Sequence, residues 1–367
     1  MHLSLPSLPA LDLFPAQAAS TRLRPLDSFG SNPGALNGWF FVPEGTEASD
    51  LPLVVVLHGC TQTAAGYDTG SGWSQLADLY GFAVLFPEQR RTNNPNLCFN
   101  WFEPGDTGRG AGEALSIAEM IEAMIERHGV NRQRVFITGL SAGGAMTSVM
   151  LALYPEMFAG GAVLAGLPHG AAASVQEAFR QMRSSSPTSR ASGSSIKQAS
   201  RHRGPWPAVA IWHGTADTVV SPSNAQALVE QWREVHALDG APEEGLVDGY
   251  PHRAWRDANG RVAVEEYRLT GMGHGTPLAT TGECGCGEAG AFMLEVGISS
   301  TVHSARTWGL LSVRRERTVD ERAVARSSRP SGATRRPPAL GTALRAPGAD
   351  GIAHVIENAL RSAGLMQ

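Results

Sequence analysis

This sequence of 367 residues has few of the features that assign a chain to a class at first sight. No apolar run reaches the length that spans a membrane, so we predict no membrane span. Charged residues make up only 17% and the net charge is -4, which gives no electrostatic case for binding nucleic acid. The first residues carry no basic stretch and are broken by prolines, so no signal peptide is recognised and the compartment stays open.

Cysteine is scarce as well, and there is no internal repeat. The four cysteines are Cys60, Cys98, Cys284 and Cys286, too few to decide between an oxidising and a reducing compartment. Cys284 and Cys286 offer two soft ligands, fewer than a zinc ion needs. We therefore expect no metal, and nothing in the sequence calls for another cofactor.

Apolar residues are plentiful, at 42%, and 42 glycines and 23 prolines predict many loops. Apolar runs typical of buried strands alternate with stretches of helical spacing. The expected strands are 38–42, 53–58, 82–86, 162–165, 209–212 and 261–269, and the expected helices are 74–80, 113–128, 146–153 and 222–235. This alternation predicts an α/β fold with a mostly parallel, doubly wound sheet and helices on both faces.

The flanks of this pattern differ in composition. Residues 1–25 are expected to form a loose leader, and 26–311 one α/β domain with a flexible excursion at 184–203. The stretch 312–350 is rich in arginine and proline, so we expect a disordered insertion or solvated linker. Residues 351–367 are amphipathic and are expected to form a helix that docks on the domain.

A match to G-x-S-x-G occurs at 139–143, between an apolar strand-like run and a helix-like run. This context predicts a nucleophile elbow with Ser141 at its apex. Bulky residues in place of Gly139 and Gly143 would collide with the adjoining strand and helix. The alternative is a glycine-rich turn that only caps a helix.

An elbow serine needs an acid and a base, which follow it in the order Asp or Glu, then His. Asp217 comes shortly after the expected strand 209–212, and His274 lies in a glycine-flanked loop after 261–269. We predict that His274 takes the proton of Ser141 while Asp217 holds the imidazole tautomer. Residues that compete by chain order alone are Asp239, Asp248, Asp257, His236, His252 and His303.

The oxyanion of an acyl-transfer reaction needs two N–H donors. We predict the backbone N–H groups of Ala142, directly after the nucleophile, and of Cys60, in the loop after 53–58. His58 is interpreted as a structural residue of that loop. Glu113 is interpreted as charge at a helix N-terminus.

Two further features concern the expected loop edge of the sheet. Cys60 and Cys98 both fall in such loops, and either a disulfide or two free thiols is compatible with the sequence. Four aromatic residues are candidates for an apolar ester pocket, or else for the core: Trp101, Phe102, Tyr67 and Trp212.

Several motifs in order resemble the polyhydroxybutyrate depolymerase-like esterases, relatives of the feruloyl and acetylxylan esterases. The motifs are HGCTQT at 58–63, PEQ at 87–89, NWF at 100–102, RGAGE at 109–113, GLSAGG at 139–144, WHGTAD at 212–217 and GHG at 273–275. The resemblance runs from about Leu26 to Leu310 and implies an α/β-hydrolase fold that cleaves carboxyl esters.

The resemblance implies an esterase for short hydroxyacyl esters such as poly(3-hydroxybutyrate) or its oligomers. Family members are commonly exported, but no polymer-binding module is visible here. The alternatives are a feruloyl or acetylxylan esterase, a peptidase or amidase with the same triad, and a polymer-binding pseudoenzyme. The sequence does not indicate an oligomeric state.

Overall fold

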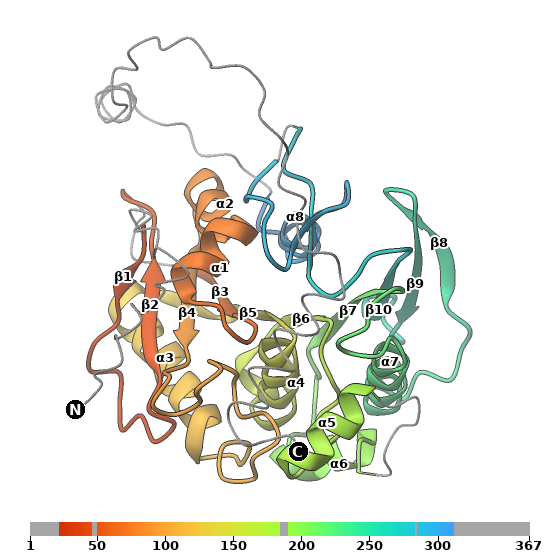
Figure 1. Cartoon of the computed structure of the whole chain (residues 1–367), viewed down its shortest axis with the longest axis horizontal. Helices are drawn as coiled ribbons and strands as arrows, with labels where there is room; N and C mark the ends of the chain where they lie inside the picture. Colours follow the sequence, from red (N-terminus) through yellow and green to blue (C-terminus); the bar gives the residue numbers. More distant parts are fainter. Residues whose placement is uncertain (1–21, 46–49, 184–189, 283–284, 312–367) are drawn as a thin grey trace, which may run out of the picture.

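A ten-stranded sheet forms the centre of the computed structural model, which describes residues 22–45, 50–183, 190–282 and 285–311 (Figure 1). Its strand order is β1-β2-β4-β3-β5-β6-β7-β10-β9-β8. The strands from β4 to β10 in this order are parallel, and both edges are antiparallel. The expected α/β fold with a mostly parallel sheet is confirmed.

The elements alternate along the chain as the sequence predicts. The sheet strands are β1 Arg24–Pro25, β2 Asn37–Phe41, β3 Leu51–Leu57, β4 Ala83–Glu88, β5 Val130–Leu140, β6 Gly160–Leu164, β7 Ala208–Gly214, β8 Glu243–Val247, β9 Tyr250–Arg256 and β10 Val262–Leu269. The helices are α1 Ala64–Ser71, α2 Trp73–Tyr80, α3 Gly112–His128, α4 Ala142–Leu153, α5 Val175–Arg183, α6 Gly193–Ser200, α7 Ser223–His236 and α8 Ser300–Thr307. A 3-10 turn, Pro155–Met157, and a small two-stranded sheet of β11 Thr276–Leu278 and β12 Met293–Glu295 complete the described part.

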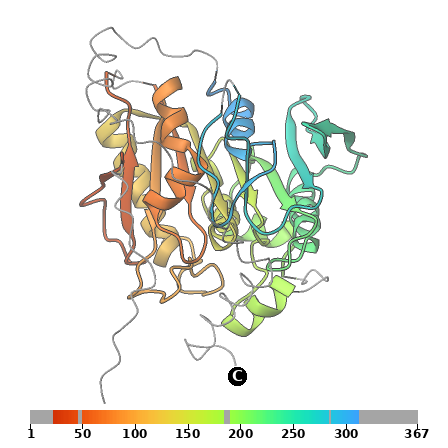
Figure 2. The ribbon, with the colours of Figure 1, turned by 45° about the horizontal axis from the view of Figure 1, so that its top comes forward.

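Two hydrophobic clusters cover the two faces of the sheet. Helices α3, α4 and α7 cover one face, and α1, α2 and α8 the other (Figures 1 and 2). Strand β3 shows the alternation, because Leu53, Val55 and Leu57 join the first cluster while Val54 and Val56 join the second. All seven residues of β3 are buried, as the continuous apolar run predicts.

The excursion expected at 184–203 contains a helix, α6, in its described part. Ile196 of α6 is fully buried in the cluster beneath α4 and α7. The N-terminus of α6 has a local N-cap, Ser192, and a second partner from outside, because the Glu234 carboxylate accepts the N–H groups of Gly193 and Ser194. This partner lies far away in sequence, which is why the composition of the segment predicts flexibility instead.

The ends of the predicted domain are described only in part. Of the leader expected over 1–25, residues 22–25 are described: Leu23 is buried, and β1 pairs with β2. The predictions for 312–350 and 351–367 lie outside the described residues. None of the helices in the described ranges has both the length and the apolar character that a membrane crossing requires.

Candidate active site

The predicted nucleophile lies at the junction of β5 and α4. Ser141 has φ 57° and ψ -116°, a conformation that is strained for a residue with a side chain. A Cβ atom at Gly143 would lie 2.3 Å from the Leu57 carbonyl oxygen, and one at Gly139 would lie 2.4 Å from the Gly143 carbonyl oxygen. Both glycines are therefore required by close backbone approach, as the sequence predicts.

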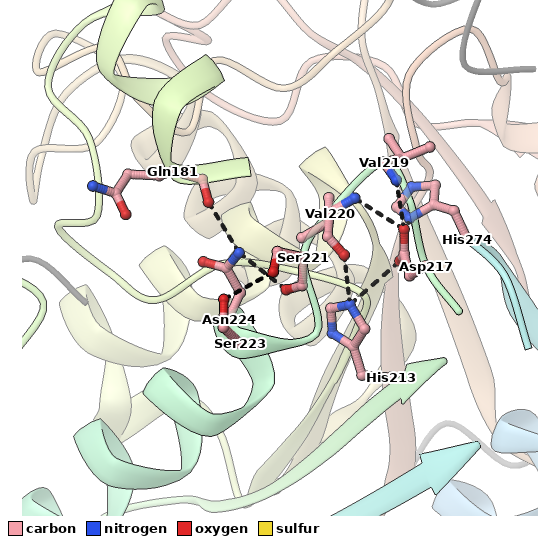
Figure 3. Close-up of polar contacts among 9 residues, drawn as sticks. All are labelled: Gln181, His213, Asp217, Val219, Val220, Ser221, Ser223, Asn224 and His274. Atoms are coloured by element: carbon pink, nitrogen blue, oxygen red, sulfur yellow. Dashed lines mark hydrogen bonds and ion pairs between the residues drawn. The ribbon is translucent and has the colours of Figure 1, made fainter. Parts of the chain in front are cut away.

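The predicted acid and base are hydrogen-bonded to each other. Asp217 follows β7, and its Oδ2 accepts a hydrogen bond from His274 Nδ1 over 2.7 Å (Figure 3). Its Oδ1 accepts the backbone N–H groups of Val219 and Val220, each over 2.9 Å. The Asp217 side chain is fully buried and that of His274 is 5% exposed. A proton held on His274 Nδ1 leaves Nε2 free to act as a base.

The charge state of Asp217 follows from these contacts. Burial acts to raise its pKa, but hydrogen bonds from His213 and His274 outweigh burial and hold the pKa well below its ordinary value. The carboxylate therefore stays ionised at pH values where an ordinary aspartic acid is protonated. This is the electrostatic state that a triad acid requires.

The competing residues have other partners or lie on the surface. Each of the three rival histidines contacts a different group: His236 Nε2 the Pro207 carbonyl, His252 the Glu265 carboxylate and His303 the Asp248 carboxylate. Asp257 accepts N–H groups within its own turn, and Asp239 is exposed. None of these contacts involves Ser141, and neither do the described hydrogen bonds of His274 and Asp217, so these two residues are distinguished by their contact with each other.

The loop that carries Cys60 is tied down at several points. The Gly59 N–H donates to Gln62 Oε1, and the Thr61 N–H donates to the Asn96 carbonyl over 2.7 Å. Cys60 forms a disulfide with Cys98, which settles the choice the sequence left open. No described residue accepts the Cys60 N–H, and Ala142 is the first residue of α4, so its N–H has no partner within the helix.

His58 lies beneath this loop. Its Nδ1 donates to the Gly59 carbonyl over 2.8 Å, and its Nε2 accepts the Gln89 N–H over 3.2 Å. Burial lowers the pKa of His58, which favours the neutral ring that these two contacts need. These contacts are those of a structural histidine.

A buried carboxyl group, Glu113, supports the loop that carries Cys98. Its oxygens accept hydrogen bonds from the Gln89 side chain and from the Asn100 N–H, and Gln89 Nε2 also donates to the Cys98 carbonyl. Burial and the nearby Asp106 raise the pKa of Glu113 to about 8. Sequence reasoning placed Glu113 at a helix N-terminus, and α3 does begin there, but it missed this bridge to the loop.

Ser141 lines a small pocket with a cavity volume of about 80 Å³. One wall is α5, which turns Val175, Ala178, Phe179 and Met182 toward the pocket. The remaining lining residues are Cys60, Thr61, Asn94, Asn96, Cys98, Trp101, Phe102, Ser141, Ala142, Leu167 and Val220. No charged side chain lines it, so the pocket suits an uncharged, mostly apolar group.

Two of the four aromatic candidates lie elsewhere. Trp101 and Phe102 line the pocket, but Tyr67 and Trp212 are 1% exposed and belong to the cluster on the opposite face of the sheet. The Tyr67 hydroxyl pairs with Thr276 Oγ1, and Trp212 stacks on Tyr267 with ring centres 3.6 Å apart. Their prediction as pocket residues is therefore corrected to core.

Cys286 is buried, and its Sγ lies 3.9 Å from the Ser71 carbonyl oxygen, whereas Cys284 lies outside the described residues. The described part of the chain contains no group of three or more potential metal ligands.

Strand order, elbow and pocket together define an esterase of the α/β-hydrolase superfamily. The profile of the family described as "Esterase PHB depolymerase" matches residues 36–243, so the chain belongs to that family and is a carboxylic ester hydrolase. Poly(3-hydroxyalkanoate) depolymerase C of Paucimonas lemoignei is 45% identical over 79% of this chain and 70% of the depolymerase.

Acetylxylan esterases are also related. Acetylxylan esterase A of Talaromyces purpureogenus is 31% identical over 70% of this chain and 68% of the esterase. The solved acetyl xylan esterase from Aspergillus awamori superposes with a TM-score of 0.66 and 27% identity, over 78% of this chain and 99% of the esterase. These relatives confirm the family resemblance and the fold that it implies, and they set aside the reading of a non-catalytic polymer binder.

Proposed function

We propose that this protein is a serine esterase for short-chain hydroxyacyl esters, such as poly(3-hydroxybutyrate) or its oligomers. Ser141 is the nucleophile, His274 the general base and Asp217 the acid that orients it. The observation that carries the proposal is the 2.7 Å hydrogen bond between Asp217 and His274, in a fold whose strained Ser141 opens on an uncharged pocket. The 45% identity to a poly(3-hydroxyalkanoate) depolymerase supports the substrate class.

The reaction has two halves. As Ser141 Oγ attacks the ester carbonyl carbon, its proton passes to His274 Nε2, and the carbonyl oxygen becomes an oxyanion. The N–H groups of Cys60 and Ala142 stabilise that oxyanion, and His274 then returns the proton to the departing alcohol. Water attacks the resulting acyl-enzyme with His274 again as the base, which releases the acid and restores the Ser141 hydroxyl.

The lining of the pocket is consistent with a substrate that has a small acyl group. Its apolar wall comes from α5 together with Trp101 and Phe102, which suits a short alkyl segment. Among the other lining residues, Thr61 and Asn96 carry polar side chains for a hydroxyl or an ester oxygen, whereas the Asn94 side chain is engaged by Asn100 and by the backbone of its own loop. A hydroxyacyl chain has this combination of alkyl and oxygen groups.

A second candidate substrate is acetylated xylan. It is favoured by the TM-score of 0.66 with an acetyl xylan esterase. The acetyl group is smaller than a hydroxybutyryl group, so the two candidates make different demands on the pocket. A panel of hydroxybutyrate oligomers, acetylated xylan, feruloyl esters and a peptide separates these substrates, and we expect the oligomers to show the highest kcat/KM.

The nucleophile is tested with Ser141→Ala. This variant should lose turnover of p-nitrophenyl butyrate and labelling by an organophosphonate, with an unchanged melting curve. Ser194→Ala is the matched control, because Ser194 is exposed on α6, outside the pocket. Turnover by Ser141→Ala near that of the control would contradict the assignment.

A further inference from the structure

A second buried histidine contacts the proposed catalytic acid. His213 is the penultimate residue of β7, which lies inside the sheet between β6 and β10. Its Nε2 is 3.3 Å from Asp217 Oδ2 and 2.9 Å from the Val220 carbonyl oxygen (Figure 3). Its side chain is 3% exposed. None of the reaction steps above uses this ring.

The neighbours of His213 fix its protonation. The Val220 carbonyl and the ionised Asp217 carboxylate both only accept hydrogen bonds, so Nε2 must carry a proton and donate to both. On the other side of the ring, Nδ1 is buried with no hydrogen-bond partner among the described residues. A proton there would be buried without an acceptor, so the neutral ring with its proton on Nε2 is favoured.

This donor completes the coordination of the Asp217 carboxylate. Oδ1 accepts two backbone N–H groups, from Val219 and Val220, and Oδ2 accepts from both His274 and His213. The second contact of His213, with the Val220 carbonyl, ties down the backbone just after the acid. Val220 itself lines the pocket beside Ser141.

We propose that His213 is a positioning residue, which holds the Asp217 carboxylate in the plane that His274 needs by donating its Nε2 proton to Oδ2 and to the Val220 carbonyl. The proposal rests on the assignment of Asp217 as the triad acid. The position of His213 near the end of an inner strand makes it a rigid support, since His213 itself pairs with Arg268 of β10 and the preceding Trp212 pairs with Leu164 of β6. Without it, the carboxylate keeps only contacts from its own loop and from His274 itself.

A positioning role predicts a change in the pH profile. The titratable groups that act on Asp217 are His213 and His274. Without the His213 donor, more of the Asp217 carboxylate charge acts on His274, which favours the positively charged form of that ring. The acidic limb of the kcat/KM profile should therefore move to higher pH.

The test compares His213→Leu, which removes the donor, with His213→Gln, whose side-chain amide nitrogen can take the place of the imidazole Nε2. In His213→Leu, kcat on p-nitrophenyl butyrate should fall by between about tenfold and a hundredfold, with KM nearly unchanged and the acidic limb shifted. His213→Gln should recover most of kcat and the wild-type limb. If the His213→Leu variant does not fold, His213→Asn replaces it, because the asparagine side chain is too short for its amide to reach Oδ2 of Asp217.

The outcomes separate this proposal from the proposed function. Equal losses in the leucine and glutamine variants, or a lower kcat with an unmoved acidic limb, would overturn the positioning role. Asp217→Asn is assayed alongside. If Asp217→Asn keeps wild-type turnover, the triad assignment itself fails, whereas a damaged Asp217→Asn beside a fully active His213→Leu removes only the role of His213.

Discussion

The two loops that flank Ser141 are held by different means. The loop of Cys60, on the proposed oxyanion side, is tied by a disulfide to Cys98, and the Cys98 loop is fixed in turn by Gln89 and Glu113. On the acid–base side, the described residues around Asp217 form no covalent link, and the carboxylate is held by hydrogen bonds alone.

The difference matches what each side has to do. An oxyanion donor is a backbone N–H whose charge does not change during the reaction, so it works best when it is held still. On the other side, His274 gains and loses a proton in every turnover, and hydrogen bonds to an ionised carboxylate strengthen as that charge appears. We infer that the oxyanion side tolerates a rigid crosslink because its task is only geometric.

The largest expected effect comes from disabling the acid–base side. Asp217→Asn should lower kcat by about 10⁴, because an amide no longer fixes the tautomer of His274 or stabilises its positive charge. Asp257→Asn is the matched control, since Asp257 lies in a turn with its own contacts. Steady-state kinetics on p-nitrophenyl butyrate provide the measurement, and a larger loss in Asp257→Asn would show that the wrong loop has been chosen.

Opening the disulfide should damage the oxyanion side less. A variant with both Cys60→Ser and Cys98→Ser should lose about tenfold in kcat as the N–H of residue 60 gains freedom. The disulfide spans 38 residues, and a loop of that length corresponds to about 4 kcal/mol of folding free energy.

Reduction provides the control for this prediction. A phosphine reductant should slow the wild-type enzyme and lower its melting temperature, but should leave the double variant unchanged. If the reductant affected both proteins equally, the crosslink would not be the source of the effect.

A smaller effect is expected at the pocket wall shared by both sides. Phe179→Ala removes a ring from the wall formed by α5, so kcat/KM should rise for hexanoyl relative to butyryl esters by about tenfold, the lower end of what one methylene group contributes in a hydrophobic pocket. Arg180→Ala, on the exposed face of the same helix, should leave the ratio unchanged. If the hexanoyl-to-butyryl ratio of kcat/KM were the same in the two variants, α5 would not form part of the acyl site.

The last effect is on stability and not on turnover, and it concerns the buried carboxyl group of Glu113 beneath the oxyanion side. The pKa of Glu113 is raised from 4.5 to about 8, so the folded state holds a proton that the unfolded state releases. Stability should therefore decrease as pH rises from 4.5 to about 8 and then level off. Glu113→Gln carries no titrating group, so its melting temperature, followed by calorimetry across this range, should fall less than that of the wild type. Parallel curves would show that Glu113 is already ionised at low pH.

Much of this site is readable in the sequence because its signals are local. The elbow needs glycines where backbones touch, and Gly139 and Gly143 meet carbonyl oxygens at 2.4 Å and 2.3 Å. Asp217 and His274 follow strands, so they reach the same edge of a parallel sheet, and their pairing follows from chain order. Helix α6 was missed because its stabilising contacts, the burial of Ile196 and the binding of its N-terminus by Glu234, come from other parts of the chain.

Chain order does not determine on which face of the sheet a side chain lies. Trp212 and His213 are adjacent on β7, and successive residues of a strand point to opposite faces. The sequence by itself determined that Trp212 and His213 lie next to the loop that carries Asp217. Only the tertiary structure decided that Trp212 packs in the core of the far face while His213 reaches Asp217, because the covering helices set which face carries the pocket.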